Sequence, residues 1–221
     1  MTLLFLKSPK SLAMYVEVLS WITAGHGIPK GITPLRVGSM IGYLPVVEAL
    51  LGERDGEPLE ENEMHSTEVH WAAYGGRPEV IQLLLDRGAS HSSVVFLGRT
   101  PGSIAARAGH VKVLRCLLDN GATLLERDKK GKTPLHFAAE SGHADAVELL
   151  LEKGMELELA DNRGWTVMNY PVSSRNAAVV KMLLDRGARS NGIIEGNESD
   201  FGFHKLLPLF LAREEYIVRE G

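Results

Sequence analysis

The sequence predicts an all-α protein in which helix-turn-helix units stack into a solenoid. A Leu-Leu-x-x-Gly ending occurs four times, and its glycines lie 33 residues apart, at 88, 121, 154 and 187. A Gly-x-Thr start keeps the same spacing, at 98–100, 131–133 and 164–166. Pairs of alanines lie between these marks, at 72–73, 105–106 and 138–139. Three landmarks in constant phase indicate an internal repeat, and so small a helix pair buries its apolar face only by stacking on its neighbours.

Each landmark has a physical role, which the unit 128–160 shows best. Thr133-Pro134 predicts a helix start, because the threonine hydroxyl can cap the helix and proline suits the first turn. The small alanines 138–139 let this helix approach its neighbour closely. The apolar run 146–151 predicts a second helix, and Gly154 just after it can stop a helix in the left-handed conformation without steric cost.

This pattern resembles the ankyrin repeat, and 128–160 is the closest match because it carries Thr133-Pro134-Leu135-His136 intact. The resemblance is clear from Gly56 to Gly187. It implies an ankyrin-type helical-repeat solenoid in which each unit has two antiparallel helices and a projecting hairpin-like turn. His136 and the matching His70 then resemble structural, hydrogen-bonding residues of the first helix.

The landmarks divide the chain into seven segments. In order, these are a divergent N-terminal cap or partial repeat (1–30), a divergent repeat with an acidic loop (31–64), a repeat (65–94), a second repeat (95–127), the best-matching repeat (128–160), a divergent repeat (161–190) and a degraded repeat or C-terminal cap (191–221). The acidic run from Glu53 to Glu63 is interpreted as a solvated loop, with a charged handle for a partner as the alternative.

Two units depart from the signature. Thr100-Pro101-Gly102-Ser103 lacks the leucine and the histidine, so its first helix loses a core contact and a hydrogen-bonding ring. In the divergent repeat, Pro171 stands where the family has alanine, and a proline inside a helix costs about 3 kcal/mol. We therefore expect a shortened or bent helix there, and the lowest stability of the stack around Val172–Asn176.

Composition and motifs exclude several classes. The net charge of −4 gives no overall positive field, so nucleic acid is not the expected partner. No stretch approaches the roughly 18–20 apolar residues of a membrane span, and no signal-peptide pattern is present, which predicts a cytoplasmic or nuclear protein without a membrane partner. No phosphate loop, nucleophile elbow, zinc-ligand cluster or dinucleotide fingerprint occurs, so we expect no enzyme, catalytic residue, cofactor, metal or small-molecule substrate.

Single reactive side chains have simpler interpretations. Cys116 occupies a position that is apolar in the other units, so it is expected in the core and not as a nucleophile. His110 and His143 occupy equivalent turns and could share a metal ion. The favoured interpretation is that this histidine recurs at the inter-helix turn and hydrogen-bonds the backbone.

The expected function is a non-catalytic protein–protein interaction module, a scaffold or adaptor. The resemblance implies that the hairpin tips and the inner faces of the first helices form a concave binding surface. Carried over position by position, this surface consists of Met64, Tyr74, Phe96, Leu97, Arg99, Arg107, Lys129, Lys130, Lys132, Glu140, Arg163 and Trp165, accompanied by Ser66, Asn162 and Ser173.

The composition of this surface predicts its partner. Phe96, Leu97 and Trp165 place large apolar groups where a solvated tip is usually polar, and six arginines and lysines make the strip basic. Aromatic residues and arginine are typical of interaction hot spots, so the partner is expected to have an acidic and partly apolar surface. Exchange of Lys129, Lys130 and Lys132 for glutamate is expected to weaken binding without loss of fold.

Other interpretations stay open. The aromatic residues can pack within their own turns, and the lysines can serve solubility alone. The repeats can also be an accessory or remnant region of a larger multidomain protein with an enzymatic or regulatory part. A third alternative is a nucleic-acid binder, which a steep salt dependence would reveal.

Overall fold

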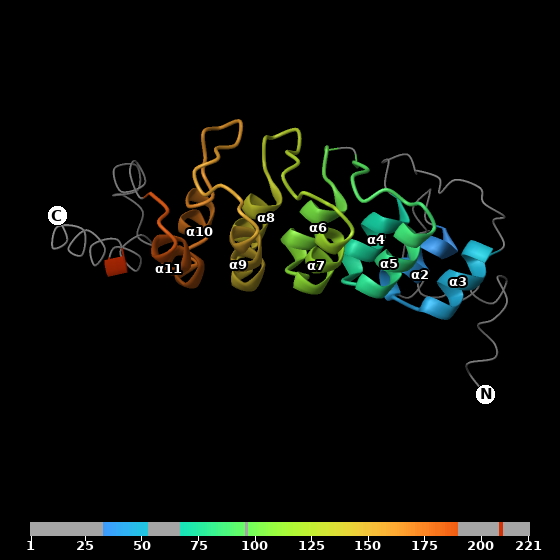
Figure 1. Ribbon diagram of the computed structural model, residues 1–221. Helices are drawn as coiled ribbons and strands as arrows, with labels where there is room; N and C mark the ends of the chain where they lie inside the picture. Colours follow the sequence, from blue (N-terminus) through green and yellow to red (C-terminus); the bar gives the residue numbers. More distant parts are fainter. Residues whose placement is uncertain (1–32, 53–66, 96, 190–207, 210–221) are drawn as a thin grey trace, which may run out of the picture. The chain divides into compact units, whose positions relative to one another are not determined.

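The computed structural model describes residues 33–52, 67–95, 97–189 and 208–209 (Figure 1). In these residues the regular secondary structure consists of helices, without any strand, which confirms the predicted all-α fold class. Contacts divide the chain into two compact units. The first comprises 1–105 and 112–123, and the second comprises 106–111 and 124–221.

The first unit is built from helix pairs. It holds α2 (Pro34–Ile41), α3 (Leu44–Gly52), α4 (Glu68–Gly75), α5 (Pro78–Asp86), the start of α6 (Pro101–Ala108) and most of α7 (Val111–Asp119). Helices α2 and α4 pack on each other, and each also contacts the second helix of its own pair. Val47, Val69, Ile81 and Leu84 are fully buried and form part of the core.

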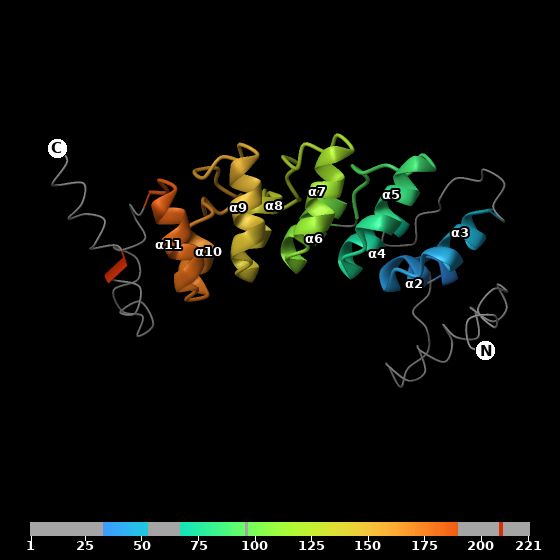
Figure 2. The ribbon, with the colours of Figure 1, turned by 60° about the horizontal axis from the view of Figure 1, so that its bottom comes forward.

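The second unit repeats this arrangement and positions the candidate site. It holds the end of α6, α8 (Pro134–Ser141), α9 (Ala144–Glu152), α10 (Asn169–Ser173) and α11 (Ala177–Asp185). Helix α8 packs on α9 and α10, and α11 packs on α9 and α10. Figures 1 and 2 show α9 and α11 side by side, and in Figure 1 the two loops of this unit project beyond its helices. Phe137, Leu150, Val167 and Leu183 are fully buried between the helices.

Helix α8 begins where the sequence predicts. Thr133 is its N-cap, and the His136 ring completes a capping box, with Nδ1 accepting from the Thr133 N–H at 3.1 Å and lying 2.9 Å from Thr133 Oγ1. Thr67 and His70 make the same contacts at the start of α4. These histidines therefore have the structural role that the resemblance implied.

Helix α10 confirms the predicted effect of the proline. It has five residues, whereas α4, α6 and α8 have eight each. Asn169 takes the place of His136, and its Oδ1 accepts from Thr166 N–H at 2.8 Å and from Thr166 Oγ1 at 3.1 Å. Arg175 takes the place of Gly142 at the end of the helix with φ 58°, in the left-handed region that favours glycine. The lowest stability around 172–176 stays a prediction.

Candidate functional site

An aspartate closes the first tip of the second unit, the hairpin-like turn formed by residues 128–132. The Asp128 N–H donates to the Lys132 carbonyl at 2.9 Å, and Gly131 N–H donates to the Asp128 carbonyl at 2.8 Å. Asp128 Oδ1 accepts from the backbone N–H groups of Lys130 and Lys132, at 2.8 and 2.9 Å. Asp128 is 5% exposed, so its carboxylate is buried against the turn, whereas Lys129 and Lys130 are exposed.

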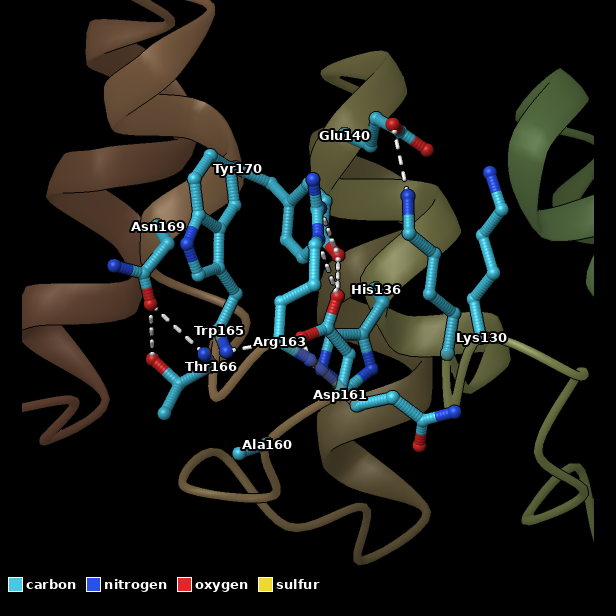
Figure 3. Close-up of polar contacts among 12 residues, drawn as sticks. Lys130, His136, Glu140, Ala160, Asp161, Arg163, Trp165, Thr166, Asn169 and Tyr170 are labelled. Carbon is cyan, nitrogen blue, oxygen red and sulfur yellow. Dashed lines mark hydrogen bonds and ion pairs between the residues drawn. The ribbon is translucent and has the colours of Figure 1, made fainter.

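Asp161 closes the second tip, residues 161–165, in the same way, and it also takes part in a network of side-chain hydrogen bonds. Its Oδ1 accepts from the N–H groups of Arg163 and Trp165, at 2.8 and 3.0 Å. Its Oδ2 accepts from the Tyr170 hydroxyl at 2.6 Å and lies 3.3 Å from Arg163 Nε. Arg163 Nη2 also donates to the Tyr170 oxygen at 3.1 Å, so three side chains form a closed polar triangle (Figure 3).

Aromatic rings border this triangle. The Arg163 guanidinium carbon lies 4.3 Å from the centre of the Trp165 ring, within the range of a cation–π contact. The rings of Trp165 and Tyr170 meet edge to face with centroids 5.4 Å apart. Trp165 is half-buried by these contacts, so its ring packs partly within the tip and remains partly accessible.

The network fixes the protonation states of its members. Burial alone would raise the pKa of Asp161, but hydrogen bonds from Tyr170, Trp165 and Arg163 lower it to about 2. Burial, reinforced by the hydrogen bond to Asp161, raises the pKa of Tyr170 well above its usual range. The bond to Tyr170 is the main cause of a raised Arg163 pKa. At neutral pH the triangle therefore holds a carboxylate, a neutral phenol and a guanidinium.

Lys132 is placed differently from the sequence expectation. Its side chain is only 8% exposed, and Nζ lies 2.9 Å from Glu140 Oε1. The same Nζ stands 4.4 Å from the centre of the Tyr170 ring and 5.6 Å from that of Phe137. The sequence could not reveal this burial, because the ring that covers Lys132 belongs to the next repeat. A Lys132→Glu exchange would put two carboxylates together, so it does not isolate binding from folding.

The other predicted residues of the second unit are accessible. Arg107, Lys129, Lys130 and Arg163 are exposed, and the side chain of Glu140 is 40% exposed. Asn162 ties the two tips together. Its N–H donates to the Lys130 carbonyl at 2.9 Å, and its Nδ2 donates to the Lys129 carbonyl at 3.0 Å. The structure therefore brings Lys129, Lys130 and Arg163 onto linked turns.

The remaining predicted residues belong to the first unit or lie outside the described residues. Tyr74 on α4 is 63% exposed, and Leu97 and Arg99 are half-buried. The Arg99 carbonyl lies 3.3 Å from His70 Nε2, which holds that tip to α4. Met64 and Phe96, together with Ser66, fall outside the described residues.

The structure also places the histidine and the cysteine that the sequence singled out. They contain no group of three or more His, Cys, Asp or Glu side chains placed to hold a metal ion. A Cβ on Gly109 would come within 2.6 Å of the His143 ring, so this histidine packs on the inter-helix turn. Cys116 is half-buried, not fully in the core as expected, and its Sγ lies 3.5 Å from the Pro78 carbonyl. Burial raises the pKa of the Cys116 thiol, which disfavours the nucleophilic thiolate.

Sequence reasoning missed Asp128, Asp161 and Tyr170. The two aspartates carried a signal, because each precedes a tip glycine by three residues and they share the 33-residue period. Tyr170 carried a weaker signal, as a polar substitution at the position of the buried Phe137.

None of the helices in the described part of the chain has the length and apolar character needed to cross a membrane.

Comparison with known families agrees with this architecture. The family model described as ankyrin repeats (3 copies) matches residues 35–128, 69–160 and 103–192. No curated protein sequence gives a match. The matched ranges overlap and together cover residues 35–192, well over half of the chain. On this evidence the chain belongs to the ankyrin repeat family.

Proposed function

We propose that this chain is a non-catalytic protein-binding module that holds an acidic, partly apolar protein partner on the tips and first helices of its second unit. Ankyrin repeats generally mediate protein–protein interaction, which supports the class of function. The observation that carries the proposal is the inward direction of both tip carboxylates. Because Asp128 and Asp161 are buried against backbone N–H groups, the exposed charges of the two tips are those of Lys129, Lys130 and Arg163.

A charge reversal on the first tip tests this proposal. The variant is Lys129→Glu with Lys130→Glu, and it leaves out the buried Lys132. The matched control is Lys153→Glu with Lys181→Glu, which makes the same charge change at the exposed residue that follows α9 and at an exposed position of α11. Each form is immobilised and used for affinity capture from a lysate of its source cells, and circular dichroism checks that the helices are retained.

The proposal predicts that a captured protein is lost with the tip variant and kept with the control variant. Equal capture by the wild type and both variants would show that the tips are not the binding surface. Capture of nothing by the folded wild type would favour the alternative of an accessory region in a larger protein. Loss of capture with both variants would mean that net charge, and not the tip, determines binding.

A further inference from the structure

We propose, building on the binding function above, that the outer edge of the Arg163 guanidinium is a subsite for a carboxylate of the partner, an aspartate or glutamate in an extended peptide segment. Tyr170 is then a positioning residue, because it holds Arg163 in the orientation that receives this carboxylate. Trp165 offers its partly accessible ring to an apolar neighbour of the same peptide.

The first support is that the Arg163 guanidinium is held from several sides and still exposed. Nε is paired with Asp161, Nη2 donates to Tyr170, and Cζ lies 4.3 Å from the centre of the Trp165 ring. The side chain nevertheless remains 57% exposed, and no described residue accepts a hydrogen bond from Nη1. A guanidinium has five N–H donors, so the outer edge can still form a bidentate pair with a carboxylate.

This restraint lowers the cost of binding. An exposed arginine normally loses rotamer freedom when it grips a ligand, which weakens the complex. Here Asp161 and Tyr170 hold the side chain through the contacts of the polar triangle, which Figure 3 shows, so we expect less rotamer freedom to be lost on binding. A bidentate geometry depends on orientation as well as charge, so an ordered arginine is suited to recognise a planar carboxylate.

Comparison of the two tips identifies Tyr170 as the positioning residue. Lys130 and Lys132 stand where the second tip has Arg163 and Trp165, and Phe137 stands where it has Tyr170. Phenylalanine has no hydroxyl, so the first tip cannot form the same triangle. The hydroxyl of Tyr170 is thus the group that links the tip aspartate to the arginine of the same tip.

The local charge balance favours an acidic peptide over nucleic acid. Arg163 and Lys132 are each paired with a carboxylate, Asp161 and Glu140, so their charges are partly neutralised. Nucleic-acid binding depends on several cations that neutralise successive phosphates. A single carboxylate needs only the open edge of Arg163, while the exposed Lys130 supplies a net positive charge nearby.

The test uses a fluorescein-labelled peptide that combines glutamates with leucines, and its glutamine counterpart, titrated against the full chain. Fluorescence anisotropy gives the affinity for the wild type, Arg163→Lys, Arg163→Gln, Tyr170→Phe and the control Lys181→Gln. We expect Arg163→Lys to weaken binding of the glutamate peptide about tenfold, nearly as much as Arg163→Gln. Lysine keeps the positive charge but lacks the planar pair of N–H donors that binds a carboxylate through two hydrogen bonds. Tyr170→Phe should weaken binding several-fold at a temperature at which circular dichroism shows it folded, and Lys181→Gln should bind as the wild type.

Four results would overturn the inference. Arg163→Lys binding as tightly as the wild type would show that charge alone suffices, and unchanged affinity of folded Tyr170→Phe would leave that residue a structural role. Equal affinity for the glutamate and glutamine peptides, or no binding of either, would remove the carboxylate subsite. Tighter binding of a single-stranded RNA with a steep salt dependence would replace the peptide with nucleic acid. The proposed function itself fails separately, when capture is insensitive to reversal of Lys129 and Lys130.

Discussion

Replacing Asp161 with asparagine should destabilise the protein by about 2 kcal/mol, because one hydrogen bond to a buried charge is lost. Asparagine keeps an oxygen for the N–H groups of Arg163 and Trp165, but it presents an amide where Oδ2 accepts from the Tyr170 hydroxyl at 2.6 Å. The contact to Arg163 adds little, because that side chain is 57% exposed and solvent screens it. The Asp161 side chain itself is fully buried, so its lost partner is not replaced by water.

Urea unfolding followed by far-ultraviolet circular dichroism measures this effect. The folded pKa of Asp161, about 2, lies below the ordinary value of 3.8. The stabilisation is therefore fully present above pH ~4, and about half of it should be lost at pH 3 as the pH falls toward the folded pKa. The difference between the wild type and Asp161→Asn should shrink accordingly between pH 7 and pH 3.

Two controls decide whether the reasoning holds. Asp128→Asn changes the equivalent aspartate, which makes the same two backbone bonds. Phe137, which has no hydroxyl, stands at the position of Tyr170, so this exchange loses no bond from a tyrosine and should cost less than Asp161→Asn. In a double-mutant cycle, Asp161→Asn and Tyr170→Phe should be non-additive by about 1 kcal/mol or more. Equal costs for the two aspartates, additive effects in the cycle, or a pH-independent difference would refute the argument.

Two further predictions concern the ends of the first helices. Arg175→Gly should raise the free energy of unfolding by about 0.5 kcal/mol, because glycine relieves the left-handed strain at φ 58°. The control Ser174→Gly, at φ −86°, should lower the free energy of unfolding. Thermal denaturation that shows no gain for Arg175→Gly would contradict this prediction. Gly142→Ala should cost about 1 kcal/mol more than Gly154→Ala, because the Asn176 side chain, whose Oδ1 caps α11 by accepting from the Val179 N–H at 3.2 Å, has to move. Both glycines have positive φ, but a Cβ at 142 would stand 2.2 Å from Asn176 Nδ2, whereas a Cβ at 154 meets nothing within 4 Å. Equal losses in urea unfolding would show that backbone strain alone matters.

The repeat architecture could be predicted because it depends on local rules applied many times. Thr133 caps the start of α8, and Gly154 follows the end of α9 with φ 84°, as capping and the left-handed conformation require. The shortening of α10 also followed from a single residue, Pro171, whose effect on a helix is local. The period then gave the order of the units without any knowledge of long-range contacts.

Contacts between neighbouring repeats could not be predicted in this way. In the first unit, Arg36 replaces the signature histidine and Glu68 replaces the proline of the next repeat. Seen one repeat at a time, these are two separate departures. In the structure, Arg36 Nε lies 3.5 Å from Glu68 Oε1, and the side chains are only 3% and 2% exposed. Removing one partner of a buried pair leaves a buried charge, so the two departures form one feature.

The same reasoning explains why the candidate site was predicted only in part. Exposure of Lys129 and Lys130 follows from their place at a tip, which the period gives directly. The burial of Lys132 does not, because it depends on the Tyr170 ring supplied by the following repeat. Tyr170 thus acts on both tips of the second unit, covering the lysine of one and ordering the arginine of the other. In a repeat protein, a departure from the signature can therefore act through the neighbouring repeat that it contacts, as the buried Tyr170 does through Lys132.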